Sequence, residues 1–137
     1  MDGIKFQSKD ESKYYEYAKG LKAKGKILNF ELQPKYELQP KFKKYGKTYQ
    51  PIYYVADFLI YCLDGSERVV DVKGMATPVA IQKRKEFDYR YPNLKLVWVV
   101  RNLTHGNKDG WIEYDELKKI RSKARRDKKK ASESKCI

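Results

Sequence analysis

Residues 54–74, "YVADFLIYCLDGSERVVDVKG", decide the fold that the sequence predicts. Two runs rich in apolar and β-branched residues flank an Asp-Gly pair, which is the pattern of a β-hairpin. Each run nevertheless carries an aspartate, Asp57 or Asp71, where an apolar residue would pack better. A buried carboxylate costs several kcal/mol unless it is paired, so these acids need either an ion pair or a cation.

Strand alternation puts Asp71 and Lys73 on one face and the valines beside Asp71 on the other face, which we expect to enter a core. A three-residue loop at 64–66 would set Asp57 opposite Lys73 on the same face. A two- or four-residue loop would turn Asp57 to the other face unless a bulge intervened.

Two interpretations of these residues are open. In the first, Asp71 and Lys73 form a structural ion pair and Asp57 is exposed. In the second, Asp57 and Asp71 hold a divalent metal with the oxygen ligands that Mg²⁺ prefers, and Lys73 is directed at the attacking water or the transition-state phosphate. The basic composition of the chain favours the metal.

The chain of 137 residues has room for one compact core, and its net charge of +13 is typical of a protein that contacts phosphate. Nucleic acid is therefore the predicted partner, ahead of an anionic membrane surface. The N-terminus lacks the apolar region of a signal peptide, and no run approaches the length of a transmembrane helix. We expect a cytoplasmic protein with no membrane partner.

Cysteine and histidine are scarce. Cys62 and Cys136 cannot make a disulfide framework and are predicted to be free thiols of a reducing compartment. The single histidine, His105, lies in a polar loop, so the sequence supplies no His-Cys zinc cluster.

Ser8 and Glu11 have the spacing of a capping box, and apolar residues then recur at helical spacing, which predicts a helix over about 9–24. The tandem repeat "FELQPKYELQPKF", residues 30–42, favours extended chain because its prolines suit edge strands or bulges. With a turn at Gly46, residues 36–63 are predicted to form an antiparallel hairpin.

Thr77 and Pro78 begin a second predicted helix that ends before Pro92. Residues 94–100, "LKLVWVV", are apolar on both faces and therefore indicate an interior strand. The resulting order of helix, three strands, helix and strand is an α/β arrangement on one sheet. Residues 118–130 carry nine basic side chains and one acid, and 131–137 are expected to be disordered.

These elements together resemble a known family. "ADFLIY", a turn and "VVDVKG" followed by a helix resemble the signature of the PD-(D/E)XK nuclease superfamily. Over roughly residues 2–100 the chain resembles small phage nucleases described as Holliday-junction-resolvase-like. The resemblance implies a restriction-endonuclease-like core, a mixed β-sheet flanked by helices in αβββαβ order. We expect a single nuclease domain at 1–117, followed by a basic helix or tail at 118–137. Ala56 stands where the motif has proline, and the second acid is Asp71 rather than the commoner glutamate.

By this resemblance Asp57 and Asp71 bind metal and Lys73 assists hydrolysis. A first-helix glutamate in some relatives implies that Glu11 completes the site, although Ser8-x-x-Glu11 can equally be a capping box alone. The implied cofactor is Mg²⁺, with Mn²⁺ as a substitute. Gln82 matches a site glutamine of some branches or is merely an exposed helical residue.

Other basic residues are expected to contact phosphates without reading bases, or else to form a solvated charged face. They are Lys83, Arg84, Lys85, Arg121, Lys123, Arg125 and Arg126.

The sequence thus predicts a Mg²⁺-dependent DNA endonuclease that selects branched DNA during phage replication or recombination, in the host cytoplasm if it is phage-encoded. Symmetric cutting of two strands implies a homodimer. Two alternatives are a general nicking or repair nuclease of the same fold, and a non-catalytic DNA-binding protein on a decayed nuclease fold. Decay usually removes an acid or the lysine, and none is missing here.

Overall fold

A five-stranded mixed sheet forms the centre of the protein in a computed structural model, which describes residues 2–135. The strand order is β1-β6-β7-β8-β9; β7 and β8 pair in parallel and the other neighbours pair antiparallel. These strands are β1 (Asn29–Leu32), β6 (Phe58–Tyr61), β7 (Glu67–Val72), β8 (Lys95–Arg101) and β9 (Trp111–Glu113). The predicted α/β class is confirmed, and the apolar segment at 94–100 is an interior strand as expected.

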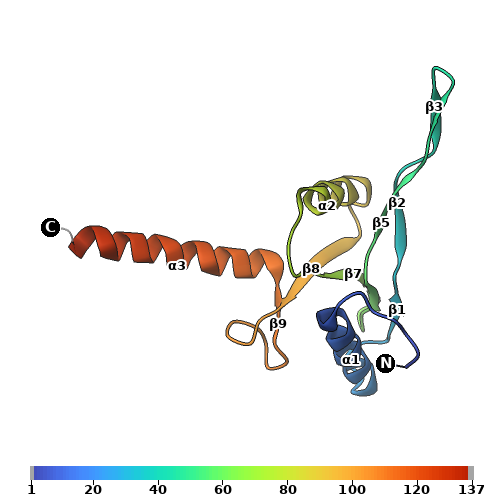
Figure 1. The fold of residues 1–137 in the computed structure, drawn as a ribbon. Helices are drawn as coiled ribbons and strands as arrows, with labels where there is room; N and C mark the ends of the chain where they lie inside the picture. The colour runs from blue at the N-terminus through green and yellow to red at the C-terminus, as the bar shows by residue number, and fades with distance from the viewer. Residues whose placement is uncertain (1, 136–137) are drawn as a thin grey trace.

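Three helices accompany the sheet: α1 (Lys9–Ala23), α2 (Pro78–Arg90) and α3 (Tyr114–Lys135). The predicted caps hold the first two, because the Ser8 hydroxyl accepts from the Glu11 backbone N–H at 3.1 Å and the Thr77 hydroxyl accepts from Ala80 at 3.1 Å. Figure 1 shows α1 and α2 on opposite sides of the sheet.

Two hydrophobic cores fill the space on the two faces of the sheet. The first packs α1 against one face through residues such as Ala18, Phe58 and Val70. The second packs α2 against the other face around Phe87 and Val69. Adjacent residues of β7 thus enter opposite cores, as the two-residue period of a strand requires.

A long β-ribbon continues the sheet outward. Its strands are β2 (Lys35–Gln39), β3 (Phe42–Lys44), β4 (Lys47–Tyr49) and β5 (Ile52–Val55). The register continues from the sheet into the ribbon, because Leu32 pairs with Phe58 and Lys35 with Val55, and it shifts once between Glu37 and Gln39. Between these pairs the Asp57 carbonyl accepts from Gln33 N–H at 2.9 Å. The predicted hairpin with its turn at Gly46 is confirmed, and its outer end projects away from the rest of the molecule (Figure 1).

The loop between β6 and β7 has the predicted three residues but lies one residue earlier, at 63–65. Cys62 N–H donates to Ser66 O at 2.9 Å, and Phe58 pairs with Val70. Gly65 has a φ of +87°, which suits the last position of a three-residue hairpin loop. Extending this register by one residue places Asp57 across from Asp71, which corrects the expected pairing with Lys73. The odd loop length keeps Asp57 on the predicted face.

The C-terminal part of the fold contains features that the sequence pattern does not predict. β9 joins the sheet beside β8, and α3 begins at Tyr114 and extends away from the sheet (Figure 1). The described helix includes 131–135, for which composition predicts disorder; Cys136 lies outside the described residues. Cys62 is a half-buried free thiol, and His105 is exposed in its loop. In the described part of the chain, no helix combines the length and apolarity needed to cross a bilayer.

Candidate functional site

The four predicted catalytic residues line one pocket of about 360 Å³ at the carboxyl end of β7. Glu11 comes from the first turn of α1, Asp57 from the bend before β6, Asp71 from β7, and Lys73 from the residue after that strand. The pocket is completed by Gln7, Ser8, Val55, Val72 and Gly74. Three carboxyl groups and one ammonium group therefore face the same space in a chain of net charge +13.

Asp71 is the most firmly held of the acids. It is 5% exposed, and its Oδ2 accepts a hydrogen bond from the Tyr54 hydroxyl at 2.6 Å. Lys73 Nζ lies 3.1 Å from the same oxygen. The Tyr54 hydroxyl in turn accepts from Trp98 Nε1 at 2.8 Å. This chain of donors fixes the Asp71 carboxylate within the second core.

Asp57 is half-buried, and its Oδ2 accepts from the Val72 backbone N–H at 2.8 Å. Burial, a hydrogen bond with Asp71 and the charge of Asp71 together raise the pKa of the Asp57 carboxyl to about 8, against the opposing effect of the Val72 hydrogen bond. The ion pair of the structural interpretation is present, but its expectation of an exposed Asp57 is wrong. The two aspartates instead act on one another electrostatically.

Glu11 takes part in the helix cap through its backbone and lines the acidic pocket with its side chain. Its backbone N–H is capped by Ser8, while the residue as a whole is 5% exposed and lines the pocket. Burial and the charge of Asp71 raise the pKa of the Glu11 carboxyl, and a hydrogen bond from the Gln7 backbone acts in the opposite direction. The capping interaction therefore leaves the side chain free to serve the pocket.

Among residues 2–135, no three Asp, Glu, His or Cys side chains stand in the arrangement of a ready-made metal site. The chemistry of the donor set still suits a hard cation, because the pocket offers only oxygen ligands, from Glu11, Asp57 and Asp71. The pKa of Asp57 and that of Glu11 are raised in part by a neighbouring carboxylate. A bound cation would relieve that repulsion.

Tyr54 and Trp98 support the pocket residue Asp71 through hydrogen bonds, and the sequence did not single them out. Both are buried, and both lie in segments that the sequence predicts to be strands. Trp98 also lies beneath two basic groups, with Lys73 Nζ 5.0 Å and the Arg84 guanidinium 4.1 Å from its ring centre. Tyr54 begins the stretch 54–74 and Trp98 lies within 94–100, but an aromatic residue in a predicted strand can be either a core residue or a hydrogen-bonding partner.

The basic residues of α2 lie in different settings. Arg84 stacks on Trp98 and pairs with Asp115, at 3.2 Å from each carboxylate oxygen, so it is held by the protein rather than presented to a phosphate. Lys83 is half-buried. Lys85 and Gln82 are both exposed and line a groove beside the ribbon that is separate from the acidic pocket.

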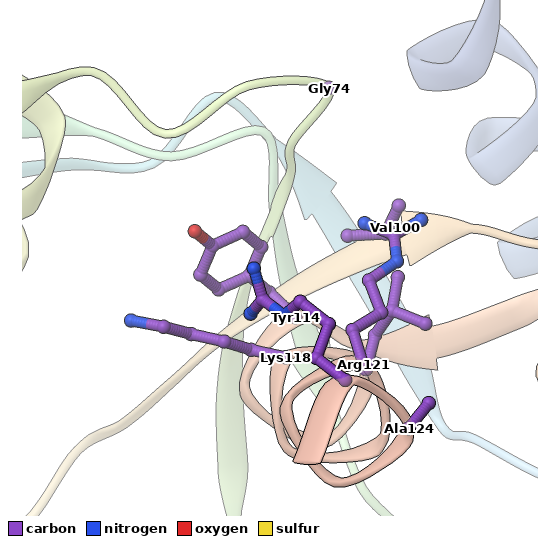
Figure 2. Close-up of a pocket in the computed structure, with 8 residues that line it drawn as sticks. Gly74, Val100, Tyr114, Lys118, Arg121 and Ala124 are labelled. Atoms are coloured by element: carbon purple, nitrogen blue, oxygen red, sulfur yellow. The ribbon is translucent and has the colours of Figure 1, made fainter. Parts of the chain in front are cut away.

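A second pocket, of about 470 Å³, lies between α3 and the end of the sheet. Lys118, Arg121 and Arg125 line it together with apolar residues such as Val100, and Figure 2 shows the side chains of Lys118 and Arg121 extending from the helix. Gly74 lines this basic groove and also the acidic pocket, so the two adjoin. Lys123 and Arg126 are exposed elsewhere on α3.

Comparison with known proteins gives one family. No curated protein and no solved structure matches the chain. A family match extends over residues 1–107, which include α1 to β8 and all four residues of the acidic pocket but neither β9 nor α3. The chain therefore belongs to the family described as "Protein of unknown function (DUF1064)".

Proposed function

We propose that the protein is a Mg²⁺-dependent DNA endonuclease that hydrolyses phosphodiester bonds, with Mn²⁺ able to replace Mg²⁺. The observation that carries the proposal is the convergence of Glu11, Asp57, Asp71 and Lys73 in one pocket. These residues come from separate elements, and the pocket that they line adjoins a basic groove. Carboxylates for a metal beside cations for phosphates are the parts that phosphodiester hydrolysis needs.

The order of the helices and strands along the chain also supports the proposal. When the ribbon, β9 and α3 are set aside, the elements follow one another as α1, β1, β6, β7, α2 and β8, which matches the αβββαβ order expected of a restriction-endonuclease-like core. The ribbon is an excursion between β1 and β6 that leaves this order intact. The pocket also lies at the carboxyl end of a strand, where ligand sites of α/β sheets are commonly found.

Each residue of the pocket has a part in this chemistry. Asp57 and Asp71 would hold the ion, with Glu11 as a third oxygen ligand. When bound, Mg²⁺ supplies Lewis-acid stabilisation of the phosphate and lowers the pKa of a coordinated water. Lys73 keeps its ammonium group beside Asp71 and over Trp98, where it can donate to the nucleophilic water or to a phosphate oxygen. Tyr54 and Trp98 are positioning residues that orient Asp71.

We further propose that the substrate is branched DNA and that the enzyme works as a homodimer. Support comes from the distribution of charge: basic groups line the groove along α3, and a lysine-rich ribbon end projects from another side of the sheet (Figure 1). Surfaces that face different directions can contact more than one duplex arm. Symmetric cutting of two strands then requires two copies of the pocket.

The test is a cleavage assay with purified protein on a four-way junction, nicked duplex and linear duplex, in Mg²⁺, Mn²⁺ or EDTA. We expect cleavage with either metal, none in EDTA, and the highest rate on the junction. Equal rates on all substrates would favour a general nicking nuclease. Binding without cleavage in any metal would reject the nuclease and favour a DNA-binding protein.

The Asp71→Asn variant provides the residue-level control. It keeps the shape of the side chain but removes the charge on which metal affinity depends, so cleavage should be abolished. DNA binding should persist or tighten because a carboxylate that repels phosphate is gone. Cleavage at the wild-type rate would place the metal elsewhere.

A further inference from the structure

The outer end of the ribbon, residues 41–50, forms an arm that is exposed at all ten of its residues. The arm carries four lysines and no acid, and three aromatic residues alternate with them in the sequence "KFKKYGKTYQ". Because it is exposed, this segment contributes little to a hydrophobic core. Its lysines and aromatic rings are instead suited to bind a polyanion that carries flat groups able to stack.

The turn at the end of the arm contains a residue that is unusual for its backbone conformation, Tyr45. Tyr45 and Gly46 have φ values of 49° and 75°, so both central residues lie in the left-handed region, as in a type I′ turn. Such turns favour Asn-Gly, and a bulky side chain with positive φ is uncommon. The Tyr45 side chain is also 97% exposed. Neither turn geometry nor packing explains the tyrosine, whereas a ligand that covers its ring would.

The neighbouring side chains form a surface suited to nucleic acid. Phe42 and Tyr49 stack across β3 and β4, with ring centres 4.7 Å apart and planes 8° apart. Lys47 Nζ lies 4.8 Å from the centre of the Tyr49 ring, and Lys44 Nζ lies 5.7 Å from that of Tyr45. Aromatic faces stack on bases and lysines neutralise phosphates, which is the combination that binds unpaired strands.

We propose that the arm binds nucleic acid and recognises a branch or single-stranded segment, with Tyr45 stacked on an unpaired base and the arm lysines on the flanking phosphates. This inference rests on the proposed function for the identity of the polymer as DNA. A two-stranded ribbon fits the major groove of duplex DNA. Residues 41–45, the exposed part of one strand of the arm, extend about 17 Å at about 3.3 Å per residue, which exceeds the depth of that groove, about 8.5 Å. A second copy of the arm is disfavoured as the occupant because two lysine-rich ends repel each other.

The experiment measures DNA affinity of the full chain in EDTA, where the proposed cleavage cannot occur. The probes are a linear duplex and a four-way junction carrying 2-aminopurine at the branch. Tyr45→Asn is the decisive variant, because Asn suits the turn better than Tyr and so removes the ring without unfolding the arm. Tyr45→Phe retains the ring, and Tyr89→Ala removes a tyrosine on α2 that is 91% exposed.

We expect Tyr45→Asn to weaken junction binding about tenfold, the size of one base-stacking interaction, while duplex affinity changes by less than about twofold. The 2-aminopurine signal should change on binding of wild type, Tyr45→Phe and Tyr89→Ala, but not of Tyr45→Asn. Wild-type junction affinity in Tyr45→Asn would overturn the proposal. So would a dimer in sedimentation that becomes a monomer in this variant, since the arm would then contact a second copy. A protein that never cleaves but shows the expected binding pattern would reject the nuclease and retain the arm.

Discussion

Tyr54 links two buried polar groups, since its hydroxyl donates to Asp71 and accepts from Trp98. Tyr54→Phe would leave the Trp98 N–H, in a side chain that is 2% exposed, without its acceptor. We expect the free energy of unfolding to fall by about 1–3 kcal/mol, the usual effect of one unsatisfied buried donor. Urea denaturation measures the change. The matched control is Tyr53→Phe on the same strand, for which a change below about 0.5 kcal/mol is expected. Equal decreases in the two variants would contradict a specific role for the Tyr54 hydroxyl.

The acid cluster makes stability depend on pH. The pKa of Asp57 rises from 3.8 to about 8 on folding, so the folded state binds this proton more tightly than the unfolded state does. Its contribution to stability is therefore complete below about pH 4 and is lost as the pH rises toward about 8. In EDTA the Tm should fall across this window, and Asp57→Asn should flatten the decline. A Tm that rises with pH in wild type, with the same slope in Asp57→Asn, would show that Asp57 ionises freely in the folded protein.

At the scale of the element, one residue of α1, Glu11, supplies both the backbone N–H that Ser8 caps and a carboxyl group of the acidic pocket. Glu11→Gln keeps the backbone N–H that Ser8 caps and removes only the charge. Cleavage should fall at least about tenfold, which corresponds to about 1.4 kcal/mol less transition-state stabilisation. The Tm should hold or rise because a buried acid is gone. Ser8→Ala, the matched control, should lower stability by about 1 kcal/mol and leave more activity than Glu11→Gln. The reverse pattern would assign Glu11 to the cap alone.

The β6–β7 hairpin shows which features of the site can be predicted from the sequence and which cannot. Two-residue alternation correctly placed Asp71 and Lys73 on one face, because that period follows from the pleat alone. The loop position was missed by one residue, although Gly65 signals it: the last position of a three-residue loop takes positive φ, which glycine adopts without strain. The Tyr54–Trp98 hydrogen bond joins residues 44 apart in sequence, so no local pattern contains it. β9 has only three residues and depends on pairing with β8.

At the scale of the whole molecule, charge is divided between an acidic pocket and basic extensions. Residues 118–130 carry nine basic side chains against one acid, and most of α3 extends beyond the sheet (Figure 1). The sequence predicted this basic segment but not that Gly74 would join its groove to the pocket. That junction depends on where β8 and β9 place the start of α3. Under the proposed function, we expect α3 to be the path of the DNA backbone that leaves the pocket.

Truncation after Leu117 tests that path, because it removes the basic part of α3 and keeps a side chain that is 2% exposed in the fold. DNA binding should weaken, and the slope of log K against log salt should decrease by about 0.9 for each phosphate that the shortened protein no longer neutralises, or about 2.7 for three phosphates. Cleavage of DNA that is already bound should continue, since the pocket is intact. Replacing the exposed Lys22, Lys24 and Lys26 with Gln lowers the net charge elsewhere and should alter the slope far less. An unchanged slope in the truncated protein would remove α3 from the DNA interface and leave the arm as the main basic surface for DNA.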